Sequence, residues 1–395
     1  MLDESTVPVR PTSTELGPSG LGYSAVQLPM QLRAARQKTA ATSLSVVDLD
    51  AASSPDVKLT TLPLEYPAHW LSPVRLSPFA HTIEHGTMAW MESLGLFSSS
   101  AAADEVRAME PRHYGGYPHS LAAYEHALAF CQYVTMWLLW DDKVVEKATS
   151  IFQVEPALAA LAGTPVDPEH RNDPYVRAFR HLGDEYERLG ASRAWRTGFA
   201  DAMRHWARQA ILEEEVRRRT AGADRPFQET LALRVETNGL LPTSMTLERA
   251  VGIELPNALR ADPCYLSLLN HAGQIVCIVN DLVAVGKDLH HGQQASNTVL
   301  CYRRNTGRPL REAYEALIDV HDRSIKTYDR LAAMLLAKAE KDVRERFAAF
   351  LGQLRYMCSG FAFWHTGAAR YRRFLAVEAG QAFRVEIVAP SSAAA

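Results

Sequence analysis

Three acidic side chains, Asp141, Asp142 and Glu146, close a long apolar stretch that ends in Trp137-Leu-Leu-Trp140. Carboxylates grouped beside an apolar surface are costly unless a cation offsets their charge. On a helix Asp142 and Glu146 project together, and Asp141 lies about 100° away. Mg²⁺ prefers such oxygens and bridges them to phosphate. The pattern indicates a pocket for a metal and an anion, and the alternative is a solvated acidic helix end.

A second polar cluster follows another apolar stretch. Asn280, Ala284 and Asp288 recur every fourth residue, so on a helix they share one stripe that drifts by about 40° per step. Asn280 and Asp288 can offer oxygens to a cation, and Lys287 can reach an anion. The same residues also fit an ordinary helix end capped by Gly292, and the two interpretations do not conflict.

Basic residues occur at two further positions. Arg234 precedes an expected helix break at Gly239 and Pro242, and a planar guanidinium binds a diphosphate through paired hydrogen bonds. Broken helix ends also expose backbone groups that can face a charge. Arg370 and Tyr371 lie in a basic segment at the end of the last expected helix. Taken alone, Arg234 fits a salt-bridged arginine, and the basic segment fits a solvated helix end.

Composition excludes several classes of protein. The chain has 395 residues, a net charge of -3 and a sequence pI near 6.5, so no basic field points to nucleic acid. No uninterrupted apolar run approaches the ~18 residues of a membrane span, and the first 30 residues lack the apolar core of a signal peptide. Widely spaced cysteines without a CxxC pair predict a reduced, cytoplasmic protein with buried thiols. They are Cys131, Cys264, Cys277, Cys301 and Cys358.

The two ends of the chain read as tails. Residues 1–70 are rich in Pro, Ser, Thr and Gly and lack periodicity, which predicts a disordered segment. Residues 16–29 are an apolar island within it, suited either to packing on the chain's own domain or to docking on another protein. We also assign residues 376–395 to a C-terminal tail.

Residues 71–375 have helical periodicity nearly throughout, which predicts a single all-α domain of long helices. The only strand-like segment is a short run that begins at Arg384. The expected helices span 78–96, 119–147, 174–188, 192–219, 227–250 with the break, 259–289, 310–337 and 340–374.

Together, these motifs resemble those of the class I terpene synthases in order and spacing over roughly residues 70–375. The acids at 141–146 are similar to that family's aspartate-rich motif, and residues 280–288 to its second metal motif, NDxxSxxxE. Arg234 lies 46 residues before the second motif, where bacterial members carry a diphosphate-sensing arginine. Arg370 and Tyr371 resemble the terminal RY pair.

The resemblance implies a Mg²⁺-dependent cyclase that ionises a prenyl diphosphate, with three Mg²⁺ ions. It implies metal binding by Asp141, Asp142, Glu146, Asn280 and Asp288. It implies diphosphate binding by Arg234, Lys287, Arg370 and Tyr371. Arg234, Thr237 and Asn238 would couple diphosphate sensing to ionisation at the helix break. From their positions near the motifs, the expected cavity aromatics are Phe130, Tyr133, Trp137 and Trp364.

Two residues depart from the family pattern. Ala284 replaces the metal-binding Ser or Thr, and Asp288 replaces Glu, so we expect weaker binding of one Mg²⁺. A degenerate, diphosphate-binding homologue is therefore an alternative. A chain-elongating prenyltransferase is disfavoured, because it would need a second DDxxD motif where this chain has Asn280-Asp281.

The proline-rich tail resembles the layout of 2-methylisoborneol synthases, which favours geranyl diphosphate or its 2-methyl derivative as substrate. Farnesyl diphosphate and a C20 diphosphate are the alternatives. The segment Gly17-Pro-Ser-Gly-Leu-Gly22 looks like tail motifs of cyclases packaged in encapsulin shells. The expected partners are thus a prenyl diphosphate, an encapsulin shell and a second copy in a homodimer, with no nucleic acid or membrane.

Overall fold

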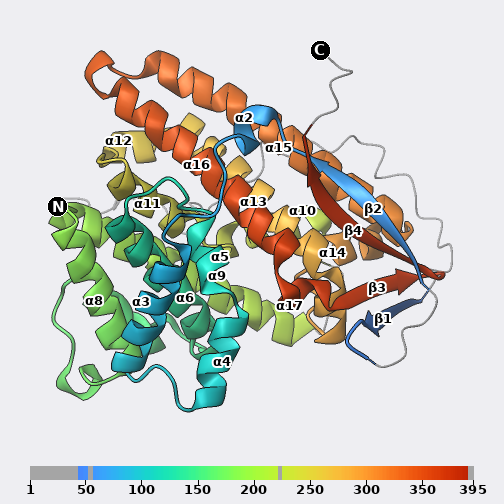
Figure 1. Ribbon diagram of the computed structural model, residues 1–395, viewed down its shortest axis with the longest axis horizontal. Coiled ribbons are helices and arrows are strands. Elements are labelled where there is room, and N and C mark those ends of the chain that lie inside the picture. Colours follow the sequence, from blue (N-terminus) through green and yellow to red (C-terminus); the bar gives the residue numbers. More distant parts are fainter. Residues whose placement is uncertain (1–42, 52–56, 221–224, 390–395) are drawn as a thin grey trace, which may run out of the picture.

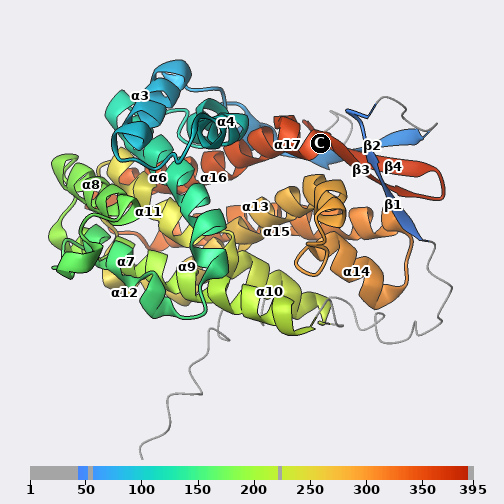
Figure 2. The ribbon, with the colours of Figure 1, turned by 90° about the horizontal axis from the view of Figure 1, so that it is seen from below.

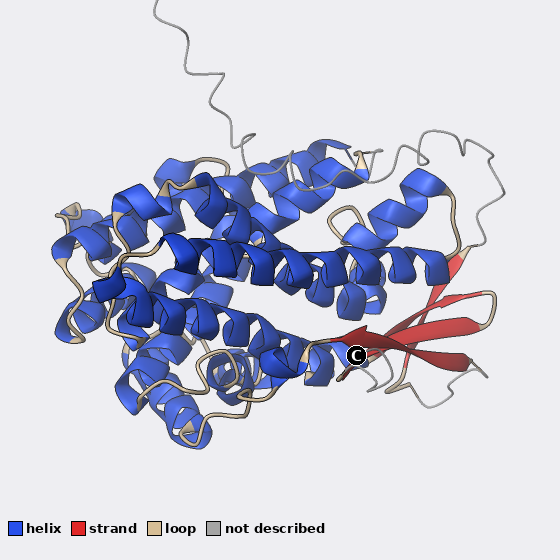
Figure 3. Cartoon of the chain, turned by 90° about the horizontal axis from the view of Figure 1, so that it is seen from above, coloured by secondary structure: helices blue, strands red, loops and turns tan. Residues whose placement is uncertain are grey.

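The computed structural model describes residues 43–51, 57–220 and 225–389. Helices make up most of these residues, and a small sheet lies at one end of the helical body (Figures 1 and 3). The predicted α-helical fold is confirmed. The larger helices are α3 (Ala80–Ser93), α6 (Tyr124–Lys143), α8 (Pro174–Arg188), α9 (Arg193–Thr220), α10 (Phe227–Thr237), α11 (Leu240–Ala250), α13 (Pro263–His290), α15 (Leu310–Lys338) and α16 (Lys341–Gly367).

Shorter helices join these elements: α2 (Ala68–Leu71), α4 (Ser100–Ala108), α5 (Pro111–Gly116), α7 (Glu155–Leu161), α12 (Asn257–Arg260), α14 (Thr298–Thr306) and α17 (Ala369–Arg372). The described residues also contain three 3-10 turns, η2 (Val145–Lys147), η3 (Ile151–Gln153) and η4 (Pro168–His170). Most predicted long helices end within a few residues of the observed ones. The largest differences are in the helix predicted for 340–374, since α16 stops at Gly367, and in that predicted for 119–147, since α6 begins at Tyr124 and stops at Lys143.

Helix α13 runs through the middle of the body and packs against α10, α15, α16 and the sheet (Figure 2). Asp262 begins it by accepting hydrogen bonds from the N–H groups of Cys264 and Tyr265. By length and composition it is the one helix of the described residues that could cross a membrane, but 89% of its most apolar window is buried in the protein. It is therefore the core helix of the bundle.

The end of α13 is fixed by the predicted glycine cap. Gly292 has a φ of 71°, which a side chain would disfavour. The N–H of Gln293 donates to the carbonyl of Asp288 at 2.7 Å, and the N–H of Gly292 donates to that of Leu289 at 3.4 Å. This Schellman turn directs the chain after α13 back along the helix end.

The sheet joins the two ends of the described chain. Its order is β1 (Leu44–Asp48), β3 (Phe374–Glu378), β4 (Gln381–Val388), β2 (Lys58–Glu65). β3 is antiparallel to β1 and β4, whereas β2 and β4 are parallel. Our assignment of residues 1–70 and 376–395 to tails is therefore wrong for these strands. β1 and β2 pair with strands at the other end of the described chain, which local pattern cannot show, whereas β3 and β4 form a local hairpin. Residues 1–42, with the island at 16–29, lie outside the described residues.

Candidate active site

A cavity of about 790 Å³ opens among α6, α9, α10, α11, α13, α16 and α17. Most of the predicted site residues line it. They are Asp141, Asp142, Glu146, Arg234, Thr237, Asn238, Asn280, Lys287, Asp288, Arg370, Tyr371, Trp137 and Trp364. The fold thus brings together residues that are more than 200 positions apart in the chain.

The three acids form one cluster, with ligand oxygens within 4.8 Å of one another. Asp141 and Asp142 lie in the last turn of α6, but Glu146 lies on the 3-10 turn η2 and not on a continued helix as predicted. Burial raises the pKa of Asp141 well above its usual value, and the charges of Glu146 and Asp142 raise it further. This unbalanced negative charge fits a divalent cation.

Arg234 projects from α10 toward α13. Its Nη2 donates to Asp281 Oδ1 at 2.8 Å and to Asn280 Oδ1 at 3.2 Å. Asp281 is 1% exposed, and its other oxygen accepts hydrogen bonds from the backbone N–H and the hydroxyl of Thr298. The guanidinium is therefore held at the cavity wall by a buried, fully bonded carboxylate.

The predicted helix break separates α10 from α11. Gly239 has a φ of 73°, and a Cβ there would lie 2.0 Å from the indole of Trp137. Asn238 stabilises the break, because its amide donates to the carbonyl of Gly273 and its oxygen accepts from the N–H of Leu240. The break and α13 are thereby tied together beside the cavity.

Asn280 and Asp288 form the second polar wall, on α13. Asp288 Oδ2 accepts a hydrogen bond from Asn297 at 2.9 Å, and Lys287 Nζ lies 3.4 Å from its other oxygen. Burial raises the pKa of Asp288, whereas Lys287 and Asn297 oppose that shift. Ala284, between the two along α13, is 1% exposed and does not line the cavity. Its methyl group has no oxygen to offer a cation.

Tyr371 connects α17 to this wall. Its hydroxyl accepts a hydrogen bond from Asn280 Nδ2 at 3.0 Å. Arg370 and Lys287 lie 5.2 and 5.5 Å from the centre of its ring, within the range of cation–π attraction. Two cations and a phenol therefore converge at one end of the cavity.

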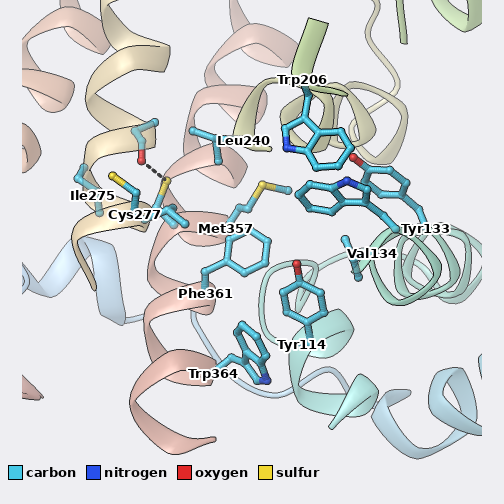
Figure 4. Packing of buried hydrophobic residues seen from close by; sticks show 14 of the residues in the cluster. Tyr114, Tyr133, Val134, Trp206, Leu240, Ile275, Cys277, Met357, Phe361 and Trp364 are labelled. Carbon is cyan, nitrogen blue, oxygen red and sulfur yellow. Dashed lines mark hydrogen bonds between the residues drawn. The ribbon is translucent and has the colours of Figure 1, made fainter. Parts of the chain in front are cut away.

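The apolar part of the cavity wall adjoins Tyr371, whose ring centre lies 5.8 Å from that of Trp364. Tyr114 lies 4.3 Å from Trp364 and 5.7 Å from Phe361 between ring centres, and Figure 4 shows this group beside Met357. Two predicted cavity aromatics, Phe130 and Tyr133, are fully buried and are not among the residues that line this cavity. Phe130 stacks on His119 and Tyr133 on Trp137.

Sequence reasoning missed further lining residues. Glu213, Glu214 and Arg217 face the cavity from α9, and Asp281 joins them from α13. The loop after α13 contributes His291, Gln293, Ser296 and Asn297. The sequence shows a charged run from Glu213 to Arg217, but which of its side chains face the cavity depends on how α9 packs.

Two polar atoms in the cavity wall support an anionic ligand. Arg234 Nε and Thr237 Oγ1 are buried and have no hydrogen-bond partner within the described residues. Buried donors are rarely left unpaired in a native protein. Beside a cluster of carboxylates they fit a metal-bound diphosphate, with the apolar end left for a hydrocarbon chain. Such a bundle with such a site is that of a class I terpenoid synthase.

Comparisons with known proteins agree with this assignment of fold and site. Residues 132–327 match the family "Terpene synthase family 2, C-terminal metal binding". Pristinol synthase of Streptomyces pristinaespiralis is 26% identical over 76% of this chain and 82% of its own length. A (+)-T-muurolol synthase from Roseiflexus castenholzii, named as farnesyl diphosphate cyclizing, is 27% identical over 65% and 78%.

A crystal structure of a mutant of the SVS_A2 protein from ancestral sequence reconstruction has the same fold, with a TM-score of 0.65 and 21% identity over 78% of this chain and 89% of that one. The chain belongs to the bacterial class I terpene synthases. It is an enzyme that acts on a prenyl diphosphate as a lyase.

Proposed function

We propose that the chain binds farnesyl diphosphate with Mg²⁺, ionises it and cyclises the resulting cation. The observation that carries the proposal is the position of Arg234. It is anchored to Asp281 in one cavity with the acids of α6, the basic pair of α17 and an aromatic floor. The T-muurolol synthase relative, which is named for cyclising farnesyl diphosphate, supports a C15 substrate.

In this proposal Arg234, Lys287 and Arg370 donate hydrogen bonds to diphosphate oxygens, and Tyr371 orients Arg370 and Asn280. Asp141, Asp142, Glu146, Asn280 and Asp288 would hold three Mg²⁺ ions. When bound, these ions would supply the positive charge that lets the diphosphate leave as the allylic C–O bond breaks heterolytically.

The walls of the cavity then protect the cation. Trp137, Phe361 and Trp364 line it, and their ring faces attract positive charge. Ring faces also offer no strong hydrogen bonds that would hold water beside the cation, which water would quench. Thr237 and Asn238, at the helix break, couple the position of Arg234 to the position of the substrate's reacting end.

Geranyl diphosphate or 2-methylgeranyl diphosphate is the second candidate substrate. It is favoured by the resemblance of the proline-rich tail to that of 2-methylisoborneol synthases. A C20 diphosphate has the longest hydrocarbon chain of these candidates and would have to fill more of the aromatic part of the cavity than the others.

One assay separates these substrates. Purified protein with Mg²⁺ is incubated with the C10, methylated C10, C15 and C20 diphosphates, and products are identified by gas chromatography with mass spectrometry. We expect cyclic products from the C15 substrate and none from Arg234→Ala. Cyclic products from a C10 substrate alone would overturn the farnesyl proposal. Products that lengthen only when isopentenyl diphosphate is added would indicate a prenyltransferase. Binding of diphosphate without any turnover would indicate a degenerate homologue.

We further propose that residues 16–29, which lie outside the described residues, dock a cytoplasmic homodimer of the enzyme to an encapsulin shell. Support comes only from the likeness of Gly17-Pro-Ser-Gly-Leu-Gly22 to such tail motifs. Deleting residues 1–30 should abolish co-purification with the shell and leave turnover unchanged. Co-purification that survives the deletion would contradict this role, and light scattering would give the oligomeric state.

A further inference from the structure

The strand β3 is covalently continuous with the basic end of the cavity. It begins at Phe374, two residues after α17, and α17 carries Arg370 and Tyr371. Arg373 and Phe374, at the junction, also line the cavity. Because so few bonds separate them, whatever fixes the start of β3 also fixes α17.

The start of β3 is held by β1. Asp48 pairs with Phe374 in the antiparallel register, and the N–H of Leu49 donates to the carbonyl of Arg373 at 2.9 Å. Asp48 also accepts two hydrogen bonds from the Arg373 guanidinium, at 2.9 Å from Nε and 2.7 Å from Nη2. A paired contact of this kind restricts both the position and the orientation of the arginine.

The same junction presses on the end of α13. Gly286 leaves no room there, since a Cβ would lie 2.3 Å from the carbonyl oxygen of Phe374. His290 stacks on the Phe374 ring at 4.1 Å with an angle of 18° between planes. The strand therefore abuts the turn of α13 that carries Lys287 and Asp288.

We propose that Asp48 is a positioning residue for diphosphate binding. Through Arg373 it holds α17 against α13, so that Arg370 and Tyr371 face the same point as Lys287. The inference rests on the proposed diphosphate site and adds to it an N-terminal strand residue that never touches the substrate.

An alternative role for Arg373 predicts different effects of mutation. Arg373 lines the cavity itself, so it could contact diphosphate directly while its pair with Asp48 remains an inert surface contact. In that case Arg373→Gln would weaken binding and Asp48→Asn would not. If Asp48 acts through Arg373, both changes weaken binding, and the double variant is no weaker than Arg373→Gln alone.

The test uses the full chain, with inorganic diphosphate and Mg²⁺ as the probe in isothermal titration calorimetry. We expect Asp48→Asn to weaken binding about two- to fivefold, the range of a well-ordered surface pair, and Asp48→Glu to restore most of it. Hydrogen exchange in residues 369–378 should rise in Asp48→Asn. The matched control is Glu185→Gln, which breaks another paired contact, with Arg188 on α8, and should change neither measurement.

The possible failures are distinguishable. Wild-type affinity and exchange in a folded Asp48→Asn variant would overturn the positioning role and leave the diphosphate site intact. A wild-type chain that does not bind inorganic diphosphate with Mg²⁺ would overturn the proposed site, and the positioning role with it. Thermal unfolding of each variant shows whether a loss of affinity reflects a loss of folded protein.

Discussion

The guanidinium of Arg234 lies 2.8 Å from a carboxylate oxygen of Asp281, which is almost fully buried and also bonded to Thr298. The acid that anchors Arg234 thus belongs to the same helix as the second polar wall. Arg234 cannot move without disturbing α13. A ligand that binds Arg234 and shifts its side chain therefore also shifts the metal-binding wall on α13.

Replacing Arg234 should therefore remove turnover. We expect Arg234→Ala to lower kcat by at least about a hundredfold, because a preorganised donor to the leaving group is lost. The circular dichroism spectrum should remain that of a folded helical protein, and Arg311→Ala, on the exposed side of α15, is the control. Near-normal turnover would exclude Arg234 from the mechanism.

The contact between Trp137 and Gly239 predicts a steric effect. In Gly239→Ala the new methyl would lie 2.0 Å from the indole, so the free energy of unfolding should fall by about 2 kcal/mol or more. Gly252→Ala is a matched control, since Gly252 has a φ of 69° but nothing within 4 Å of the added Cβ. It should lose only about 1 kcal/mol. If denaturant titrations gave the same loss of unfolding free energy for Gly239→Ala and Gly252→Ala, the Trp137 indole would be able to move away from the new methyl without a measurable energetic cost.

The acid cluster predicts opposite effects with and without metal. Asp141→Asn removes one of three clustered charges, so without Mg²⁺ its melting temperature should rise above that of the wild type. With Mg²⁺, the concentration needed for half-maximal rate should increase about tenfold or more. Glu92→Gln, on the exposed face of α3, should change neither. If Asp141→Asn instead melted at a lower temperature than the wild type without Mg²⁺, positively charged or hydrogen-bonding groups of the protein would already be offsetting the charge of the three acids.

The departure at Ala284 is testable by restoring the family residue. Ala284→Ser restores the family hydroxyl on the α13 stripe between Asn280 and Asp288. Although Ala284 itself does not line the cavity, we expect the longer side chain to reach the metal site, so the Mg²⁺ concentration for half-maximal rate should fall about two- to threefold. Ala284→Val, which adds bulk without an oxygen, is the control. An unchanged Mg²⁺ requirement in Ala284→Ser would mean that this position contributes nothing to the metal site.

Buried histidines predict a loss of stability in acid. Burial lowers the pKa of His119 to about 3. Between that pH and the unfolded pKa near 6.5, the unfolded chain therefore binds a proton at this histidine that the folded chain does not bind. The stability is fully present above the unfolded pKa near 6.5 and is lost as pH falls toward 3, by at most about 1.4 kcal/mol per pH unit. His119→Gln should flatten the pH dependence of unfolding between pH 6.5 and 4.5, and the exposed-site variant His85→Gln should not.

Local pattern predicted the helices and most of the cavity wall, because acids at the ends of apolar helices and a glycine at a helix break are short-range signals. It could not show which side of α6 faces the cavity, so Phe130 and Tyr133 were grouped with Trp137. It also missed Asp281, whose role depends on Thr298 folding back beside it. Of the strands, the sequence indicates only the run from Arg384, which lies within β4. The pairing of β1 and β2 with strands at the other end of the described chain leaves no local signal.

The pairing of β1 with β3 also sets the order of assembly. Asp48 and Arg373 meet although 325 residues separate them, and a contact of such long sequence separation forms only after the intervening chain has been made and has collapsed. During synthesis the apolar pocket and its acids are built first, and the basic end last. A nascent chain therefore has no complete diphosphate clamp, and it cannot generate a carbocation before the enclosure that contains it is finished.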